Sequence, residues 1–211
     1  MGFASWYDAH ILPRVVKAGC GSDEVTDMRR QVVPKASGAV FEMGCGGGFN
    51  QQLYDPSKIT SFSGIDPNAQ LREAALERAR SSGLEADIRG GVGEDIPFAD
   101  GMFDTVVCTY TLCSVTDQAR VLAEMRRILK PGGHLLYLEH GHAPDAGVAR
   151  WQRRIEPVWK KIAGNCHLTR EVGSAIRAAG FEIEPIGQEY FPKAPRWAGW
   201  MEWGVARRAG A

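Results

Sequence analysis

Residues 40–50 limit the possible folds of this chain more than any other stretch does. It reads VFEMGCGGGFN, in which an apolar run leads to an acid and then to four glycines among five residues. This pattern is typical of a buried strand that turns sharply beneath a nucleotide-like ligand. The dinucleotide fingerprint, which serves a pyrophosphate, needs a glycine where this chain has Phe49. Because Glu42 would repel a phosphate, the stretch favours a ligand that carries an ammonium group.

A second signal follows at Gly64-Ile65-Asp66, which ends another apolar run. Asp66 comes 22 residues after Gly44, where an acid that ends a second strand accepts hydrogen bonds from both ribose hydroxyls. A helix cap or turn acid before Pro67 is the plain alternative. Together the two signals predict a site for S-adenosylmethionine, which has a ribose, an adenine and an amino-acid tail but no phosphate.

Composition narrows the class of protein. Basic and acidic residues both number 25, so the chain has no overall positive field to attract nucleic acid. The five cysteines are odd in number and form no CxxC pair, so neither a disulfide framework nor a zinc finger is predicted. No apolar run is long enough to span a membrane, and the first residues lack the pattern of a signal peptide. We expect a soluble, cytoplasmic protein.

Apolar spacing and capping residues predict strands that alternate with helices, and therefore a parallel sheet with helices on both faces. Beyond the two strands that precede the motifs, strands are expected over 86–89, 103–109, 134–139, 181–186 and 203–208. Helices are expected over 5–18, 23–33, 69–81, 117–129, 148–163 and 169–180. Asn68 and either Thr116 or Asp117 are expected to cap two of the helices. The run 130–133 should end one helix abruptly, and Pro157 should kink or break another.

Several linked motifs resemble one enzyme family. VFEMGCGGGFN, GIDP, GEDIPFADGMFDTVVC and LKPGGHLLYLEH, in this order, resemble the class I methyltransferases that use S-adenosylmethionine. Further along, CTYTLCSV, LEHGH, WQRRIEPVWKKIAGNCHLTR and AAGF are similar to the membrane-associated alkyl-thiol methyltransferases of animals and their bacterial relatives. The resemblance implies a Rossmann-like α/β fold, with a doubly wound, mostly parallel seven-stranded sheet and an antiparallel edge hairpin.

We also expect a single domain over 1–211, in which three successive segments have different roles. Residues 1–33 would form a helical lead-in or lid, 38–140 the cofactor-binding core, and 146–211 the acceptor side. The family acid that bonds the adenine amine is replaced here by Val92, so adenine recognition is expected from the backbone near Gly93 or from Glu94. The residues expected to hold the cofactor are Glu42, Gly44, Cys45, Gly46, Gly48, Asp66, Pro67, Gly93, Glu94, Asp95 and Thr109.

Two histidines are candidates for catalysis. His140 and His142 follow the fifth strand at the edge where an acceptor would approach, and either one can serve as a base or orient the acceptor, with Glu139 as partner. A hydrogen-bonded loop residue without proton transfer is the alternative for each. The run from His140 to His142 has no acid or cysteine at a supporting spacing, so no metal site is predicted. Trp197 and Trp200 are candidates for the wall of an apolar acceptor pocket, or for core.

The predicted reaction moves a methyl group from S-adenosylmethionine to a small apolar nucleophile, which by resemblance is a thiol. A lipid, phospholipid or quinone acceptor is an alternative that uses the same cofactor site. The N-terminal helix is the hint that the sequence gives for peripheral membrane contact, and stable insertion is not expected. A non-catalytic cofactor-binding domain and a nicotinamide oxidoreductase are further alternatives, and the glycine spacing opposes the oxidoreductase. The sequence gives no oligomeric state.

Overall fold

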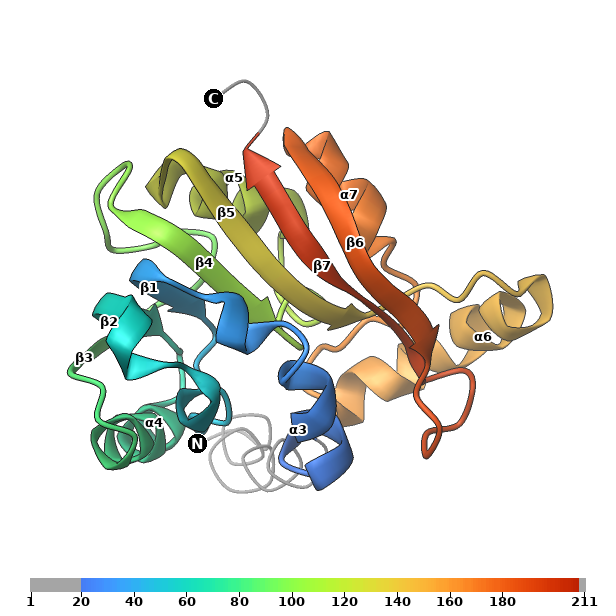
Figure 1. Ribbon diagram of the computed structural model, residues 1–211. Helices are drawn as coiled ribbons and strands as arrows, with labels where there is room; N and C mark the ends of the chain where they lie inside the picture. Colours follow the sequence, from blue (N-terminus) through green and yellow to red (C-terminus); the bar gives the residue numbers. More distant parts are fainter. Residues whose placement is uncertain (1–19, 209–211) are drawn as a thin grey trace.

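Seven strands form a single twisted sheet in the computed structural model, which describes residues 20–208 (Figure 1). The strands are β1 (Gly38–Met43), β2 (Ile59–Ile65), β3 (Ala86–Arg89), β4 (Phe103–Thr109), β5 (Leu129–His140), β6 (Phe181–Tyr190) and β7 (Trp200–Arg208). Their order in the sheet is β3-β2-β1-β4-β5-β7-β6. The first five strands pair in parallel, whereas β7 pairs antiparallel with both β5 and β6. The expected fold class is confirmed. The helix expected over 5–18 lies outside the described residues.

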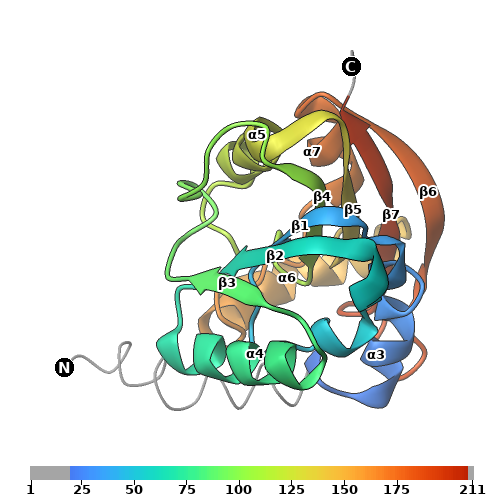
Figure 2. The same ribbon diagram turned by 60° about the vertical axis from the view of Figure 1, so that its left-hand side comes forward.

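Helices cover both faces of the sheet. They are α3 (Asp23–Arg29), α4 (Ala69–Ser81), α5 (Gln118–Ile128), α6 (Ala146–Ile162) and α7 (Val172–Ala178), with short 3-10 turns η1 (Val33–Lys35), η2 (Gln51–Leu53) and η3 (Pro56–Lys58). After rotation of the view, α5 and α7 lie on one side of the sheet and α3 and α4 on the other (Figure 2). Two buried apolar clusters fill these layers, because successive side chains of a strand point to opposite faces. Thus Phe41 packs toward α5 and its neighbour Val40 toward α4.

Helix starts follow the local rules. The Asn68 side chain accepts a hydrogen bond from the Leu71 amide at 3.1 Å and so caps α4. Asp117 accepts one from the Arg120 amide at 3.0 Å and caps α5. The prediction of these two helices from capping and apolar spacing is confirmed.

Two expectations about interruptions need correction. Residues 130–133 were expected to separate a helix from a strand beginning at residue 134, yet β5 already begins at Leu129. Leu129 pairs with Phe103 and His134 with Thr105, so the intervening residues form an irregularity within the paired strand. The other correction concerns the break expected at Pro157, because α6 runs through this residue undivided, whereas a kink there stays a prediction. A proline removes one hydrogen bond from a helix, and α6 continues on both sides of that loss.

Helix α6 leaves part of its apolar face uncovered. It extends away from the carboxyl ends of the strands, beyond the edge hairpin of β6 and β7 (Figure 1). Trp151 and Val158 on this helix are 57% and 65% exposed. Among the described residues no helix combines the length and the apolar character needed to cross a membrane.

The sheet order places a crevice where a ligand is expected. From β1 the chain runs outward through β2 and β3, and then returns to β4 on the other side of β1. The connections that follow β1 and β4 therefore diverge at the carboxyl ends of these two strands. In doubly wound sheets ligands bind at such a switch point.

Candidate active site

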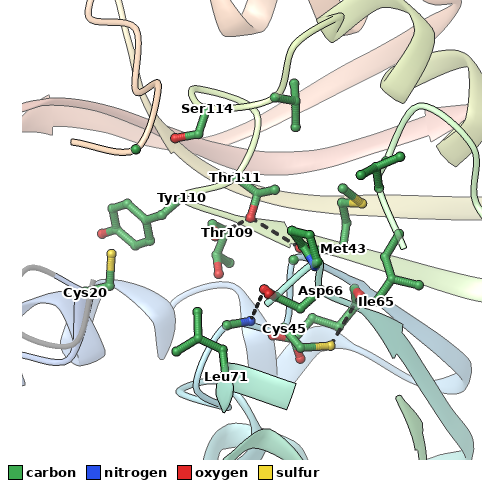
Figure 3. A pocket seen from close by; sticks show the side chains of 18 of the residues that line it. Cys20, Met43, Cys45, Ile65, Asp66, Leu71, Thr109, Tyr110, Thr111 and Ser114 are labelled. Carbon is green, nitrogen blue, oxygen red and sulfur yellow. Dashed lines mark hydrogen bonds between the residues drawn. The ribbon is translucent and has the colours of Figure 1, made fainter. Parts of the chain in front are cut away.

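A pocket of about 340 Å³ opens at the carboxyl ends of β1, β2 and β4 (Figure 3). Cys20 and Tyr110 lie at one end of this pocket, and Asp66 and Met43 lie at the other (Figure 3). Further lining residues come from α3, from the glycine-rich loop after β1, from the segment after β3 and from the end of α6. Of the residues expected to hold the cofactor, those that line this pocket are Glu42, Gly44, Cys45, Gly46, Asp66, Pro67, Gly93, Glu94 and Thr109.

The glycine-rich loop is held in a backbone conformation that other residues rarely adopt. Gly44 and Gly46 have φ angles of +67° and +51°. A Cβ atom on Gly44 would lie 2.5 Å from Thr111 Oγ1, whereas one on Gly46 would find no described atom closer than 4.0 Å. Gly44 therefore permits close contact between the loop and the segment that follows β4, and Gly46 leaves space on the pocket side.

Gly48 and Asp95 are not among the lining residues. A Cβ atom on Gly48 would lie 2.8 Å from Ala75 Cα, so this glycine lets the loop pack against α4. The Asp95 amide donates to the Val92 carbonyl in a tight turn. Contact of either residue with the cofactor stays a prediction.

Glu42, at the end of β1, is a buried acid with two neutral donors. Its carboxylate accepts hydrogen bonds from Asn50 Nδ2 and from the Tyr54 hydroxyl, both at 2.9 Å. Burial raises the pKa of Glu42 to about 7, although these hydrogen bonds and the charge of Arg29 act to lower it. A ligand ammonium group would favour the ionised form, because it would supply the positive charge that the carboxylate lacks.

Arg29, in the last turn of α3, brings a buried positive charge to the same pocket. Its side chain is only 3% exposed, and its guanidinium lies 4.9 Å from the Tyr110 ring centroid and 5.5 Å from that of Phe49. One guanidinium nitrogen donates to the Cys20 carbonyl, while Nε has no hydrogen-bond partner among the described residues. No ion pair found within residues 20–208 includes Arg29, so a ligand carboxylate would give this cation a counter-ion that the described residues do not provide.

Asp66 follows β2 on the other side of the glycine-rich loop. Its two carboxylate oxygens accept hydrogen bonds from the Gly46 amide at 2.9 Å and the Asn68 amide at 2.8 Å. These bonds fix the orientation of the carboxylate and leave further lone pairs that can accept from a ribose diol. Burial raises the pKa of Asp66, and the two amide bonds oppose that rise.

The end of the pocket near β3 is largely apolar. Ile65, Leu71 and Val92 line it together with the backbone of Gly93, which suits a flat adenine ring. Glu94 also lines the pocket, but its carboxylate accepts from the amides of Thr116 and Asp117 at 2.8 and 2.9 Å. Glu94 therefore secures the start of α5, and the backbone of Gly93 is the freer candidate for adenine recognition.

The opposite end is formed by the last residue of β4 and the residues that follow it. Thr109, Tyr110, Thr111 and Ser114 line it. Tyr110 has a φ angle of +55°, which is uncommon for a residue with a side chain. Residues held in such conformations gather at functional sites, and here the strained backbone belongs to the residue whose ring lies beside Arg29.

Neither candidate catalytic histidine lines this pocket. His140 Nε2 lies 2.9 Å from the Cys166 sulfur, and His142 lines a separate pocket. The Glu139 carboxylate accepts from the amides of Thr111 and Leu112 at 2.7 and 2.9 Å, so it secures the turn after β4. Proton transfer by either histidine stays a prediction.

Trp197 and Trp200 also lie outside the lining of the main pocket. The Trp197 ring packs edge-on against Trp159 at 5.3 Å, and the Trp200 ring packs against Tyr190 at 5.0 Å. These contacts agree with packing, the other role weighed for the two rings.

Comparison with known proteins agrees with this geometry. Residues 41–137 match the family model described as a methyltransferase domain. Thiol S-methyltransferase TMT1B of Rattus norvegicus is 38% identical over 167 residues, which cover 74% of this chain and 67% of that protein. Phosphatidylethanolamine N-methyltransferase of Cereibacter sphaeroides is 32% identical over 124 residues, covering 56% of this chain and 60% of that protein. The crystal structure of YcgJ from Bacillus subtilis shares the fold, with a TM-score of 0.70, 16% identity, and coverage of 89% of this chain and 99% of its own.

The sheet order, the switch-point pocket and these likenesses point to one family. The pocket is lined by the buried cation Arg29 and by two acids, Glu42 and Asp66. These groups are complementary to the carboxylate, the ammonium group and the ribose hydroxyls of S-adenosylmethionine. The chain belongs to the class I methyltransferases, the Rossmann-like enzymes that take their methyl group from S-adenosylmethionine.

Proposed function

We propose that this methyltransferase transfers the methyl group of S-adenosylmethionine to a small, apolar thiol. The observation that carries the proposal is the 38% identity to a thiol S-methyltransferase over 167 residues. We also propose that the chain works as a single domain, in which residues 38–140 hold the cofactor and the segment after 146 forms the acceptor side.

The charged groups of the pocket suggest how the cofactor would be held. Arg29 would bind the carboxylate of the methionine tail, Glu42 its ammonium group, and Asp66 the ribose hydroxyls. Opposite charges at Arg29 and Glu42 match the zwitterionic tail and would fix its direction along the pocket. The apolar side chains of Ile65 and Leu71 would enclose the adenine.

Methyl transfer at the acceptor end of the pocket requires few catalytic groups from the protein. When bound, the sulfonium of S-adenosylmethionine supplies an electrophilic methyl group with a good leaving group. The residues after β4 would then position the acceptor in line and exclude water. Within residues 20–208 no histidine lines the pocket, so an acceptor that ionises unaided is favoured. The thiol of free cysteine has a pKa of about 8.5 and is a few per cent thiolate at neutral pH, so a thiol ionises far more readily than an alcohol.

A lipid acceptor is the second candidate, and helix α6 supports it. The exposed side chains of Trp151 and Val158 are accompanied along the helix by basic residues, a combination typical of helices that lie on anionic membranes. The likeness to a phosphatidylethanolamine N-methyltransferase points the same way. Membrane contact through α6 is compatible with either acceptor, so the acceptor must be determined by turnover.

The test is methyl transfer from labelled S-adenosylmethionine to a panel of acceptors. The panel contains an alkyl thiol, sulfide, phospholipid vesicles and a quinol, and release of S-adenosylhomocysteine is followed in parallel. We expect labelled thioether in amounts equal to the released S-adenosylhomocysteine. The alcohol of the same chain length is the matched control and should remain unlabelled, because an alcohol is not ionised at neutral pH.

Other outcomes would contradict the thiol proposal in distinct ways. Label in phospholipid or quinol, with none in thiol, would establish the lipid or quinone alternative. Binding of S-adenosylmethionine without turnover on any acceptor would leave the fold and the cofactor site intact but remove the proposed acceptor.

A further inference from the structure

Three side chains with metal-binding atoms meet behind the acceptor end of the pocket. Cys113 belongs to the segment between β4 and α5, His140 ends β5, and Cys166 lies between α6 and α7. Their ligand atoms, two sulfurs and one imidazole nitrogen, all lie within 4.8 Å of one another. Both cysteines are buried and His140 is half-buried, so the cluster lies inside the protein.

Hydrogen bonds join two of the three segments, and His140 Nε2 lies 2.9 Å from the Cys166 sulfur of one of them. The His167 amide donates to the Cys113 carbonyl at 2.8 Å, and Asn165 Nδ2 donates to the Ser114 carbonyl at 3.0 Å. These bonds join the segment of Cys166 to that of Cys113. Trp159 Nε1 donates to the Cys166 sulfur at 3.1 Å, a contact typical of the outer hydrogen bonds that orient a metal-bound ligand.

We propose that Cys113, His140 and Cys166 bind a single zinc-class divalent cation. Two thiolates and one imidazole form a ligand set that Zn²⁺ takes in proteins, and a set of three protein ligands leaves a fourth position for water or a solute. Binding involves no change of oxidation state. Two sulfur–metal bonds and one nitrogen–metal bond form, and the cluster, two thiols and a neutral imidazole in its uncharged form, releases two protons to solvent.

The proposed cation site is separate from the cofactor pocket. None of the three ligands lines that pocket, but Ser114 and Gly164, which are close to two of them in the chain, do line it. A bound cation would therefore cross-link the segments that form the acceptor end. This inference does not depend on which acceptor is methylated, and it gives His140 the role of a ligand, not a base.

Cobalt binding to the full chain is the direct test. The protein is reduced, freed of metal with a chelator and titrated with Co²⁺ without oxygen. Absorption bands from thiolate-to-cobalt charge transfer and from tetrahedral cobalt report the ligands. We expect one Co²⁺ per chain, displaced by an equal amount of Zn²⁺.

Matched variants separate this site from other thiols and histidines. Cys113→Ser, Cys166→Ser and His140→Gln should each weaken Co²⁺ binding at least tenfold, because loss of a hydrogen-bond partner to a metal ligand already weakens binding about 10- to 100-fold. Cys20→Ser and His142→Gln, which change the same residue types outside the cluster, should bind Co²⁺ as the parent does. Circular dichroism and thermal unfolding identify any variant that fails to fold.

Two results would overturn the proposal. One is reduced protein that takes up no Co²⁺, whether or not Cys113 and Cys166 form a disulfide on mild oxidation, since the cluster would then be a thiol pair or simple packing. The other is a cobalt spectrum that persists unchanged in all three cluster variants while they remain folded.

Discussion

Replacing Arg29 with Met should lower the affinity for S-adenosylhomocysteine roughly 30- to 150-fold, or about 2–3 kcal/mol. Met keeps much of the side-chain volume next to the Tyr110 and Phe49 rings but removes the buried charge. The carboxylate of the ligand would then be desolvated without a counter-ion. Isothermal titration calorimetry measures the change, and S-adenosylhomocysteine serves as ligand because it retains the tail, the ribose and the adenine.

The neighbouring residue provides the control. Arg30 is exposed and forms a surface ion pair with Asp27, and such pairs contribute little. Arg30→Met should therefore bind S-adenosylhomocysteine within about twofold of the parent. If the two variants lose equal affinity, or if neither loses any, Arg29 does not bind the carboxylate.

Replacing Asp66 with Ala should weaken S-adenosylhomocysteine binding roughly 10- to 100-fold, because hydrogen bonds to a charged group contribute about 1.5–3 kcal/mol each. The variant also removes the acceptor of the Gly46 and Asn68 amides, so the glycine-rich loop loses a support. Adenine alone, which lacks the ribose, should bind parent and variant more nearly alike. Calorimetry with both ligands therefore separates loss of the ribose contacts from loss of the loop.

Asp87→Ala is the matched control for this substitution. Asp87 lies on the neighbouring strand β3, is exposed, and pairs with Arg89. Its removal should leave the affinity for S-adenosylhomocysteine unchanged. An Asp66→Ala protein that binds within twofold of the parent would exclude Asp66 from the ribose site.

Much of the fold follows from local sequence. The caps at Asn68 and Asp117 and the apolar strand over 103–109 depend on neighbours in the chain, and the structure has these elements where expected. The start of β5 depends instead on pairing between Leu129 and Phe103, which no local pattern reveals. The sequence also overstates the effect of Pro157 on α6. One proline removes a single hydrogen bond, and the rest of this long helix keeps its own.

Some residues of the candidate site can likewise be predicted from local sequence, and others cannot. The glycines and Asp66 belong to spaced motifs, so sequence reasoning finds them. The sequence alone does not single out Arg29, because arginines on charged helices are usually solvated. A signal is nevertheless present, because Val25 and Arg29 are four residues apart and so share one face of α3, and both are buried.

The Cys113, His140 and Cys166 cluster shows the limit of spacing arguments. Its members come from three segments, and their neighbours in the chain contain no metal-binding pattern. Only the packing of those segments beyond the ends of β4 and β5 brings the ligand atoms together.

The orientation of the cofactor is central to this account, and a crystal structure with bound S-adenosylhomocysteine tests it most directly. We expect the ribose hydroxyls on Asp66, the ammonium group facing Glu42 and the carboxylate on Arg29. The thioether sulfur should then face the residues that follow β4, where the acceptor is proposed to bind. A ligand bound in the reverse direction, or with its carboxylate held by a residue other than Arg29, would contradict the account.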